Sequence, residues 1–362
     1  MNEIKTKNEV FNAFGFTGVT EAVRYGDGHI NDTFKVTCDQ GQYILQRINT
    51  NIFKKPDEVM SNIVNVTTFL KEIVKKEGGD PQRNVLTVIK TVDGKNFFTD
   101  SDNGAWRCYI FIQDTLSVLV VTNDKELYSC AKSFGRFLKN LDGYDASKLF
   151  ETIPSFHDTR NRFKNFVKAL EEDKFKRASD IQSDIDFVLA RKADCFHIMD
   201  KIDSGAMPLR VTHNDTKLNN ILLDKETLEE VSIIDLDTIM PGSFLNDFGD
   251  SIRSGATTAA EDEVDLSKVH FDLNLFEVYT KGYLEECKDV LTADEISDIP
   301  WGAKLMTFEC GMRFLTDYLE GDTYFKIHRD KHNLDRARNQ FKLVSDMENC
   351  WEEMNAIVKK YV

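Results

Sequence analysis

The sequence predicts an α+β fold with two lobes: a small N-terminal lobe with an antiparallel sheet plus a helix, and a larger, mainly helical C-terminal lobe. At 362 residues, the chain is too long for one ordinary hydrophobic core. Short apolar runs separated by Gly, Asp and Asn turns fill its first part, which is typical of antiparallel strands. Beyond it, apolar residues recur mainly at helical spacing. We therefore expect lobes at residues 1–112 and 117–362, joined by a hinge at 113–116.

Composition and charge restrict the partners. The net charge of −15 argues against nucleic acid or an anionic membrane surface. No apolar run reaches membrane-spanning length, and the N-terminus lacks the pattern of a signal peptide. The seven cysteines are scattered and form no Cys-x-x-Cys pair, which favours reduced thiols. We therefore expect a cytoplasmic protein without nucleic-acid or membrane partners, and the oligomeric state stays open.

The N-terminal lobe is expected to begin with a short helix near residues 3–14, followed by three strands. The strands correspond to apolar runs at residues 19–25, 33–38 and 43–48. The first turn holds Gly26-Asp27-Gly28, whose backbone N–H groups can cradle phosphates, because glycine lets a backbone approach closely. The alternative is a hairpin turn without a ligand. His29 is either a substrate or phosphate contact or a polar tip on that turn.

A helix and two further strands complete this lobe. Apolar residues at helical spacing predict a helix over residues 56–76. Residues 85–89 and 106–112 are interpreted as strands, which gives a five-stranded sheet carrying one helix. The hinge begins at Gln113, where an adenine would meet backbone groups.

The C-terminal lobe is expected to be built from helices. One covers residues 124–140, and a second begins near Asp158 or Thr159, either of which can cap it. Residues 180–202 are predicted to form one long amphipathic helix. The chain from about residue 273 to residue 361 is again helical.

A polar stretch in the middle of the chain carries the chemistry. It contains His213, Asp215 and Asn220 in the spacing His-x-Asp-x-x-x-x-Asn, and an apolar run ending in Asp235 follows fifteen residues after Asn220. This is the layout of a kinase catalytic loop followed by a strand that ends in a metal-binding Asp. The alternative is a polar loop between two strands, and the joint match favours the kinase interpretation.

These residue types suit phosphoryl transfer. Asp215 can accept the proton of an acceptor hydroxyl, and Asn220 and Asp235 are oxygen ligands of the kind that Mg²⁺ prefers. A hairpin turned at residues 224–226 would bring the two ligands together. Lys217 is either a γ-phosphate contact or a solvated lysine. Asp237 is the second candidate for the metal ligand.

The tripeptide Asp247-Phe248-Gly249 spells the metal-binding motif of protein kinases, yet its place in the chain does not fit. It lies 27 residues after Asn220, and no apolar strand precedes it. We therefore interpret Asp247 as a structural residue that supports the loop or caps a helix.

At these residues the chain resembles the aminoglycoside phosphotransferase and choline kinase superfamily, which has a protein-kinase-like two-lobe fold. The superfamily loop reads His-Gly-Asp-x-x-x-x-Asn, and Asn214 replaces its Gly. The resemblance is closer still to bacterial N-acetylhexosamine 1-kinases. The stretches that carry the resemblance are residues 25–31, 43–47, 156–159, 210–222, 234–243 and 309–314.

The resemblance implies a Mg-ATP-dependent kinase that phosphorylates the anomeric C1 hydroxyl of an amino sugar, GlcNAc or GalNAc. It implies that His29, Asp215, Arg313 and Tyr324 surround the sugar. Arg313 has an equal alternative, an ion pair with Glu309 one helical turn away, and the alternative for Tyr324 is packing in the core. A kinase of an aminoglycoside, of choline or of homoserine stays open as a hypothesis, as does an inactive kinase-like binding module.

One departure concerns the nucleotide. Kinase-like sheets carry a Lys on the third strand that pairs the phosphates and a helix Glu. Here the position holds Gln46 followed by Arg47, and the helix has no acidic residue over 59–70. Either Arg47 substitutes for the Lys, or metal ions and Lys217 meet the nucleotide charge. The expected nucleotide contacts are Gly26, Gly28, Gln46, Arg47 and Gln113.

Overall fold

The computed structural model describes residues 8–26, 30–118 and 121–362, and the chain divides into two compact units. The first unit comprises Met1–Ser117, Gly143–Pro154 and Ile221–Pro241. The second comprises Val118–Asp142, Ser155–Asn220 and Gly242–Val362. Across the described part of the chain, no helix has both the length and the apolar character needed to cross a membrane.

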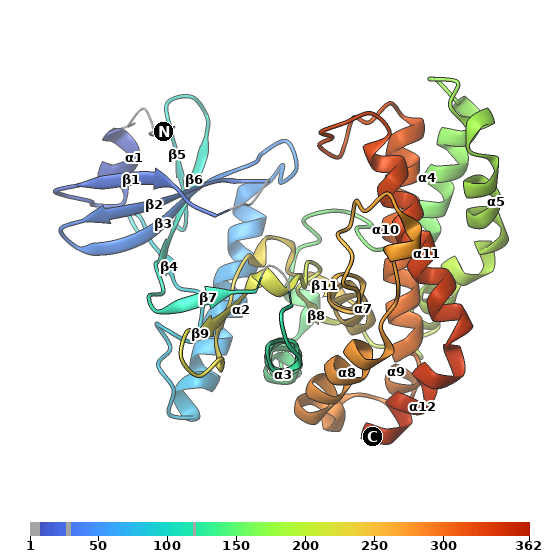
Figure 1. Cartoon of the computed structure of the whole chain (residues 1–362). Helices are drawn as coiled ribbons and strands as arrows, with labels where there is room; N and C mark the ends of the chain where they lie inside the picture. The colour runs from blue at the N-terminus through green and yellow to red at the C-terminus, as the bar shows by residue number, and fades with distance from the viewer. Residues whose placement is uncertain (1–7, 27–29, 119–120) are drawn as a thin grey trace. The chain divides into compact units, whose positions relative to one another are not determined.

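The first unit is built on a six-stranded antiparallel sheet with the order β1-β2-β3-β6-β4 and with β5 also on β6 (Figure 1). The three-stranded meander is confirmed, but the prediction of five strands is wrong because β5 is only two residues long and leaves no periodic signal. The strand expected at 85–89 shortens to β4. The strands are β1 (Glu21–Arg24), β2 (Asp32–Cys38), β3 (Gly41–Ile48), β4 (Val88–Ile89), β5 (Phe98–Thr99) and β6 (Ala105–Ile110).

Two helices accompany this sheet, α1 (Asn8–Ala13) and α2 (Pro56–Lys76). The α2 bounds match the prediction, since Pro56 suits a first helical position and the charges of the end turns oppose the helix dipole. Asn62 lies buried on α2 and holds two distant segments, because its amide donates to the carbonyls of Phe150 and Ile239 at 2.8 and 2.9 Å.

The predicted hairpin after the catalytic stretch is confirmed. It consists of β9 (Ile221–Asp224) and β10 (Glu230–Ile233), with Ile221 opposite Ile233. The connecting turn is longer than the predicted residues 224–226. β7 (Thr115–Ser117) pairs with the other edge of β9, so residues at the expected hinge continue this small sheet.

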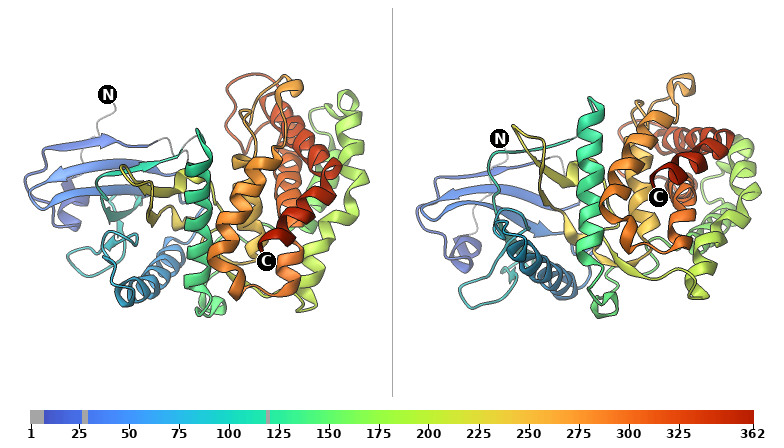
Figure 2. Two further views of the ribbon diagram at one scale, coloured as in Figure 1. Left: turned by 60° about the horizontal axis from the view of Figure 1, so that its bottom comes forward. Right: turned by 90° about the horizontal axis from the view of Figure 1, so that it is seen from below.

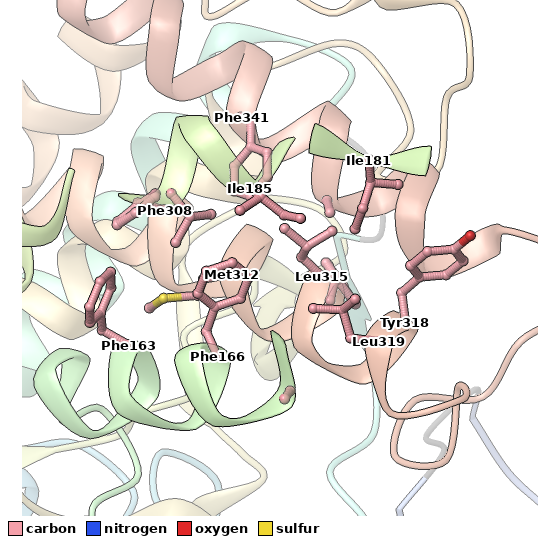
Figure 3. Packing of buried hydrophobic residues seen from close by; sticks show 14 of the residues in the cluster. Phe163, Phe166, Ile181, Ile185, Phe308, Met312, Leu315, Tyr318, Leu319 and Phe341 are labelled. Carbon is pink, nitrogen blue, oxygen red and sulfur yellow. The ribbon is translucent and has the colours of Figure 1, made fainter. Parts of the chain in front are cut away.

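The second unit is mainly helical, and one of its hydrophobic cores gathers side chains from α4, α5, α10 and α11 around Phe166, Phe308 and Leu315 (Figure 3). Helices α3 and α8 lie side by side (Figures 1 and 2). Asp158 caps α4, as predicted. The main helices are α3 (Asp124–Leu141), α4 (Thr159–Glu172), α7 (Phe244–Gly255), α8 (Leu273–Cys287), α9 (Ala293–Ser297), α10 (Ile299–Leu319), α11 (His332–Asn349) and α12 (Trp351–Tyr361).

The prediction of one helix over residues 180–202 is wrong. The segment forms α5 (Gln182–Ala190), a 3₁₀ turn (Lys192–Phe196) and α6 (His197–Asp203). Tertiary contacts account for the break, because the Thr159 hydroxyl donates to the Cys195 carbonyl at 2.5 Å inside the turn. Such contacts override a helical periodicity in the sequence.

Candidate functional site

The catalytic stretch follows β8 (Arg210–Thr212) as a loop that ends in the 3₁₀ turn Leu218–Asn220. Asn214 has a φ of 62°, in the left-handed region. Glycine adopts this conformation without strain, and Asn is one of the few other residues that tolerates it. Asn214 can therefore stand where the resembled family has Gly.

Asp247 on α7 holds this loop. Its two carboxylate oxygens accept the backbone N–H groups of His213 and Asn214 at 2.8 and 2.7 Å. The Thr216 hydroxyl donates to the carbonyl of the same Asp247. Burial raises the pKa of Asp247 to about 6, although both N–H donors favour its ionised form. The structural role predicted for Asp247 is confirmed, while Ser243 caps α7.

Asp215, Lys217 and Asn220 come together within the second unit. The Lys217 ammonium lies 2.9 Å from Asp215 Oδ1, and the Asn220 amide donates to the Asp215 carbonyl at 2.8 Å and to its Oδ2 at 3.3 Å. Burial would raise the pKa of Asp215, but the charge of Lys217 outweighs it and the pKa is lowered. The Asp215 charge raises the pKa of Lys217. Asp215 is therefore an ionised carboxylate at neutral pH.

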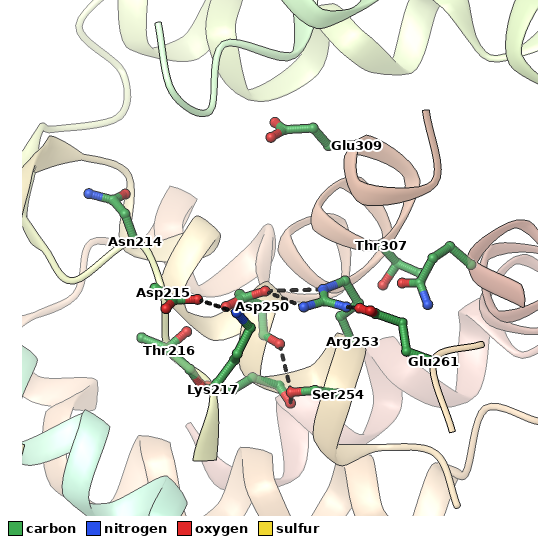
Figure 4. A network of polar contacts seen from close by, with 12 residues as sticks. Asn214, Asp215, Thr216, Lys217, Asp250, Arg253, Ser254, Glu261, Thr307 and Glu309 are labelled. Atoms are coloured by element: carbon green, nitrogen blue, oxygen red, sulfur yellow. Dashed lines mark hydrogen bonds and ion pairs between the residues drawn. The ribbon is translucent and has the colours of Figure 1, made fainter. Parts of the chain in front are cut away.

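Further charges surround Lys217 (Figure 4). The Asp250 carboxylate on α7 also raises the pKa of Lys217. Arg253 joins Asp250 to Glu261, with contacts of 3.0 and 2.6 Å. These pairs place Lys217 beside a row of alternating charges on the second unit.

Asp235 and Asp237 lie in the first unit and have different surroundings. Asp235 is exposed, with a φ of 58°, at the start of the 3₁₀ turn Leu236–Thr238. Asp237 is buried, forms an ion pair with Arg107 on β6, and accepts a hydrogen bond of 2.6 Å from Asn31. The carboxylate of Asp237 is thus bound by Arg107 and Asn31, and Asp235 is the exposed member of the two.

The expected nucleotide contacts do not share one surface. Gln46 and Arg47 are successive residues of β3, so their side chains point to opposite faces of the sheet. The carbonyl of Gln113 accepts a hydrogen bond of 2.8 Å from Arg83. Gly26 has a φ of 74°, which glycine adopts readily. Gly28 and His29 lie outside the described residues.

Two residues expected around the substrate, Arg313 and Tyr324, line one pocket of about 190 Å³ in the second unit. Arg313 lies 5.6 Å above the ring of Phe156, and its distance to Glu309 is 4.0 Å, at the limit for an ion pair. Tyr324 is 62% exposed, so it does not pack in the core. The lining consists of Arg162, Asn165, Lys168, Arg313, Thr316, Asp317, Glu320, Tyr324 and Phe325.

A buried relay that the sequence analysis did not assign joins this pocket to the loop. Glu309 on α10 contacts His157 Nδ1 at 2.9 Å, and His157 Nε2 lies 3.2 Å from the carbonyl of Asn214. Burial would raise the pKa of Glu309, but His157, Arg162 and Arg313 outweigh it and the pKa is lowered. Both partners of His157 are oxygen atoms, so at least one ring nitrogen donates a hydrogen bond. The sequence signals were His157 beside the Asp158 cap and Glu309 one helical turn from Arg313, and both residues lie in stretches that carry the resemblance.

Comparisons with known proteins show the family and the fold of the chain. A family model described as "Phosphotransferase enzyme family" matches residues 21–283. The chain is similar to an amicoumacin kinase solved with AMP-PNP, Ca²⁺ and Ami, with a TM-score of 0.61, 15% identity, and coverage of 95% of this chain and 93% of that one. It is also similar to an aminoglycoside phosphotransferase from Alicyclobacillus acidocaldarius, with a TM-score of 0.61 and 11% identity over 98% of this chain and 97% of that one. The ethanolamine kinase of Plasmodium vivax matches with a TM-score of 0.52 and 17% identity over 88% of this chain and 81% of that one. These likenesses confirm the predicted fold class.

Proposed function

The chain belongs to the phosphotransferase enzyme family, and from this membership we propose that it is a Mg-ATP-dependent kinase. Its proposed acceptor is the anomeric C1 hydroxyl of an N-acetylhexosamine, GlcNAc or GalNAc, and its product is the sugar 1-phosphate. The observation that carries the proposal is the contact of Asp215 with both the Lys217 ammonium and the Asn220 amide. The amicoumacin kinase with AMP-PNP and Ca²⁺ supports the use of a nucleotide and a divalent metal ion.

Asp215 accepts the proton of the acceptor hydroxyl and orients its oxygen for attack on the γ-phosphate. The Lys217 contact keeps this carboxylate ionised, and the Asp247 bonds to the loop backbone keep it in place. Lys217 would also supply a positive charge that offsets the charge building up on the phosphoryl oxygens.

Asn220 and Asp235 would hold the Mg²⁺ ion, which neutralises charge on the phosphate oxygens when bound. Two observations support this assignment. The amide nitrogen of Asn220 donates to Asp215, which leaves the oxygen as the ligand atom. Asp235 is exposed, whereas Asp237 is tied to Arg107. In the described residues, no three His, Cys, Asp or Glu side chains form a metal site, which suits an ion whose shell is completed by phosphate and water.

The pocket charge favours a neutral sugar over a cationic acceptor. Arg162 and Arg313 supply guanidinium donors that match carbonyl and hydroxyl oxygens but repel choline, ethanolamine or an aminoglycoside. The Asp317 carboxylate in the same lining is occupied, since it accepts backbone N–H groups of Tyr324 and Phe325 at 2.8 and 2.9 Å. The remaining carboxylate of the lining, Glu320, is exposed.

The test is ADP release with Mg-ATP and a panel of GlcNAc, GalNAc, choline, ethanolamine, homoserine and an aminoglycoside. We expect turnover with the two amino sugars and a product whose phosphorus NMR coupling identifies an anomeric phosphate. The 1-O-methyl glycoside of GlcNAc is the matched control and should be inert, because its C1 oxygen is blocked. Turnover with another acceptor but with neither amino sugar would contradict the proposal.

A further inference from the structure

Arg107 on β6 is a buried charge that the mechanism above does not use. Its side chain is 1% exposed, its guanidinium pairs with the Asp237 carboxylate, and its Nε donates to Gln46 Oε1 at 2.9 Å. A charge buried to this degree is costly unless it is paired and hydrogen-bonded. Removal of either Arg107 or Asp237 therefore takes from the other buried charge its ion-pair partner.

The strand register explains why Gln46 stands where a Lys is expected. Thr33, Gln46 and Arg107 lie opposite one another across β2, β3 and β6 and form one row of side chains, the β2–β3–β6 row. The Gln46 amide donates to Thr33 Oγ1 at 3.0 Å and accepts from Arg107, so it orients the guanidinium. A Lys at position 46 would put a like charge directly opposite Arg107, which destabilises a strand pair. The cation missing from position 46 is thus present one strand away, on β6.

At the Arg107 end of this row, Asp237 fixes the turn that carries Asp235. The Asp237 carboxylate is held from two sides, by Arg107 and by the Asn31 amide at 2.6 Å. Two residues further on, the Ile239 carbonyl accepts a hydrogen bond from Asn62 on α2. Asp235 itself has a left-handed φ of 58° and directly precedes the 3₁₀ turn Leu236–Thr238 that contains Asp237.

We propose that Arg107 is a positioning residue that holds Asp237 and thereby sets the turn that presents the Asp235 carboxylate to the metal ion. The inference rests on the proposed function. A third-strand Lys contacts phosphate directly, but the Arg107 guanidinium is buried by protein and acts through Asp237. The Arg107–Asp237 pair joins the sheet to the metal-binding turn in place of the Lys–Glu pair.

The test is the affinity for Mn²⁺ in the presence of ADP, measured as the loss of the free-Mn²⁺ signal in electron paramagnetic resonance. Groups that orient a metal ligand typically contribute about 10- to 100-fold to metal affinity. We expect Arg107→Met to weaken Mn²⁺ binding by about tenfold or more, and Arg107→Lys by roughly threefold, since it keeps the charge without the fork of donors. If the Met variant does not fold, the Lys variant decides.

The control is Val36→Ala, because Val36 is fully buried in the same sheet and its truncation lowers stability without touching the row. This variant should keep wild-type Mn²⁺ affinity at a temperature where it is folded. A folded Arg107 variant with wild-type Mn²⁺ affinity would overturn the inference. Wild-type protein that binds no Mn-ADP would instead contradict the proposed function, and one that binds it without any turnover would contradict only the proposed acceptor.

Discussion

Asp215 keeps its charge in a partly buried position because the Lys217 ammonium lies 2.9 Å away. The lowered pKa of Asp215 means that the carboxylate stays ionised until the pH falls through that lowered value. A general base whose pKa lies below its ordinary value remains competent throughout the neutral range, although it is a weaker base. The acid limb of the pH–rate profile should therefore lie at low pH.

We predict that Lys217→Met shifts this acid limb to higher pH. Without the ammonium, burial is the main influence left on Asp215, and burial raises the pKa. The measurement is kcat/KM between pH 4 and pH 9, with Asp215→Asn expected to lose roughly 10²–10⁴-fold of the rate. Lys225→Met, which changes an exposed lysine of the β9–β10 turn, is the control. An acid limb unchanged in the Lys217 variant would refute the coupling.

Asn214 illustrates how a single residue departs from its family without a change in geometry. The resembled pattern has Gly at this position, and a Gly in a fixed pattern predicts a positive φ. The φ of 62° at Asn214 shows that the backbone conformation is kept while the residue type differs. The sequence therefore allowed the loop conformation to be anticipated, but not its Asp247 partners.

Among the elements, α7 and α10 approach one another through backbone. A Cβ added to Gly249 would lie 2.1 Å from the carbonyl oxygen of Gly302, and one added to Gly302 would lie 2.7 Å from that of Leu245. This contact matters for the site, because α7 carries Asp247 and α10 carries Glu309.

We predict that Gly249→Ala separates the two helices and destabilises the protein by about 1–3 kcal/mol, as overpacking generally does. The displacement of α7 should also lower kcat, because Asp247 on α7 holds the backbone of the predicted catalytic loop by a hydrogen bond. Thermal unfolding and turnover check both effects. Gly143→Ala is the matched control, since its added Cβ would meet only Phe69, at an ordinary 3.7 Å. Equal melting temperatures for the two variants would contradict the prediction.

The β2–β3–β6 row leads to a prediction that runs against the usual kinase pattern. Gln46→Lys restores the expected third-strand Lys, yet it should lower the melting temperature by a few degrees, because like charges on opposed strand positions cost up to about 1 kcal/mol. Turnover should fall as well, since Arg107 loses its Gln46 acceptor. Gln46→Glu, which keeps an acceptor beside Arg107, should be less harmful. Improved turnover in the Gln46→Lys variant would contradict the idea that Arg107 on β6 takes the place of the third-strand Lys.

At the scale of the whole molecule, the net charge does not favour the binding of a nucleotide, so local groups would have to hold it. A net charge of −15 repels an anionic nucleotide at long range. Four cations are therefore of interest, and each has an anionic neighbour within its own unit. They are Arg107 in the first unit and Lys217, Arg162 and Arg313 in the second.

The sequence by itself determined the fold class, and it led to the prediction that the loop around Asp215 is catalytic, because both depend on local patterns. Period-2 and period-3.6 patterns identify strands and helices, and the spacing of Asp215 and Asn220 needs one short loop. The domain boundaries at 112 and 117 and the assigned nucleotide, metal and sugar contacts stay predictions.

Tertiary structure alone decided the break in residues 180–202, the extra strand β5, and the partners of the buried charges. The pairing of Arg107 with Asp237 joins residues that are 130 positions apart, and the relay from Glu309 through His157 spans 152. No periodicity records such pairs, because a charged side chain in a strand or a helix looks the same in sequence whether it faces solvent or a buried partner. Its role emerges only when folding removes it from water and makes a specific partner necessary.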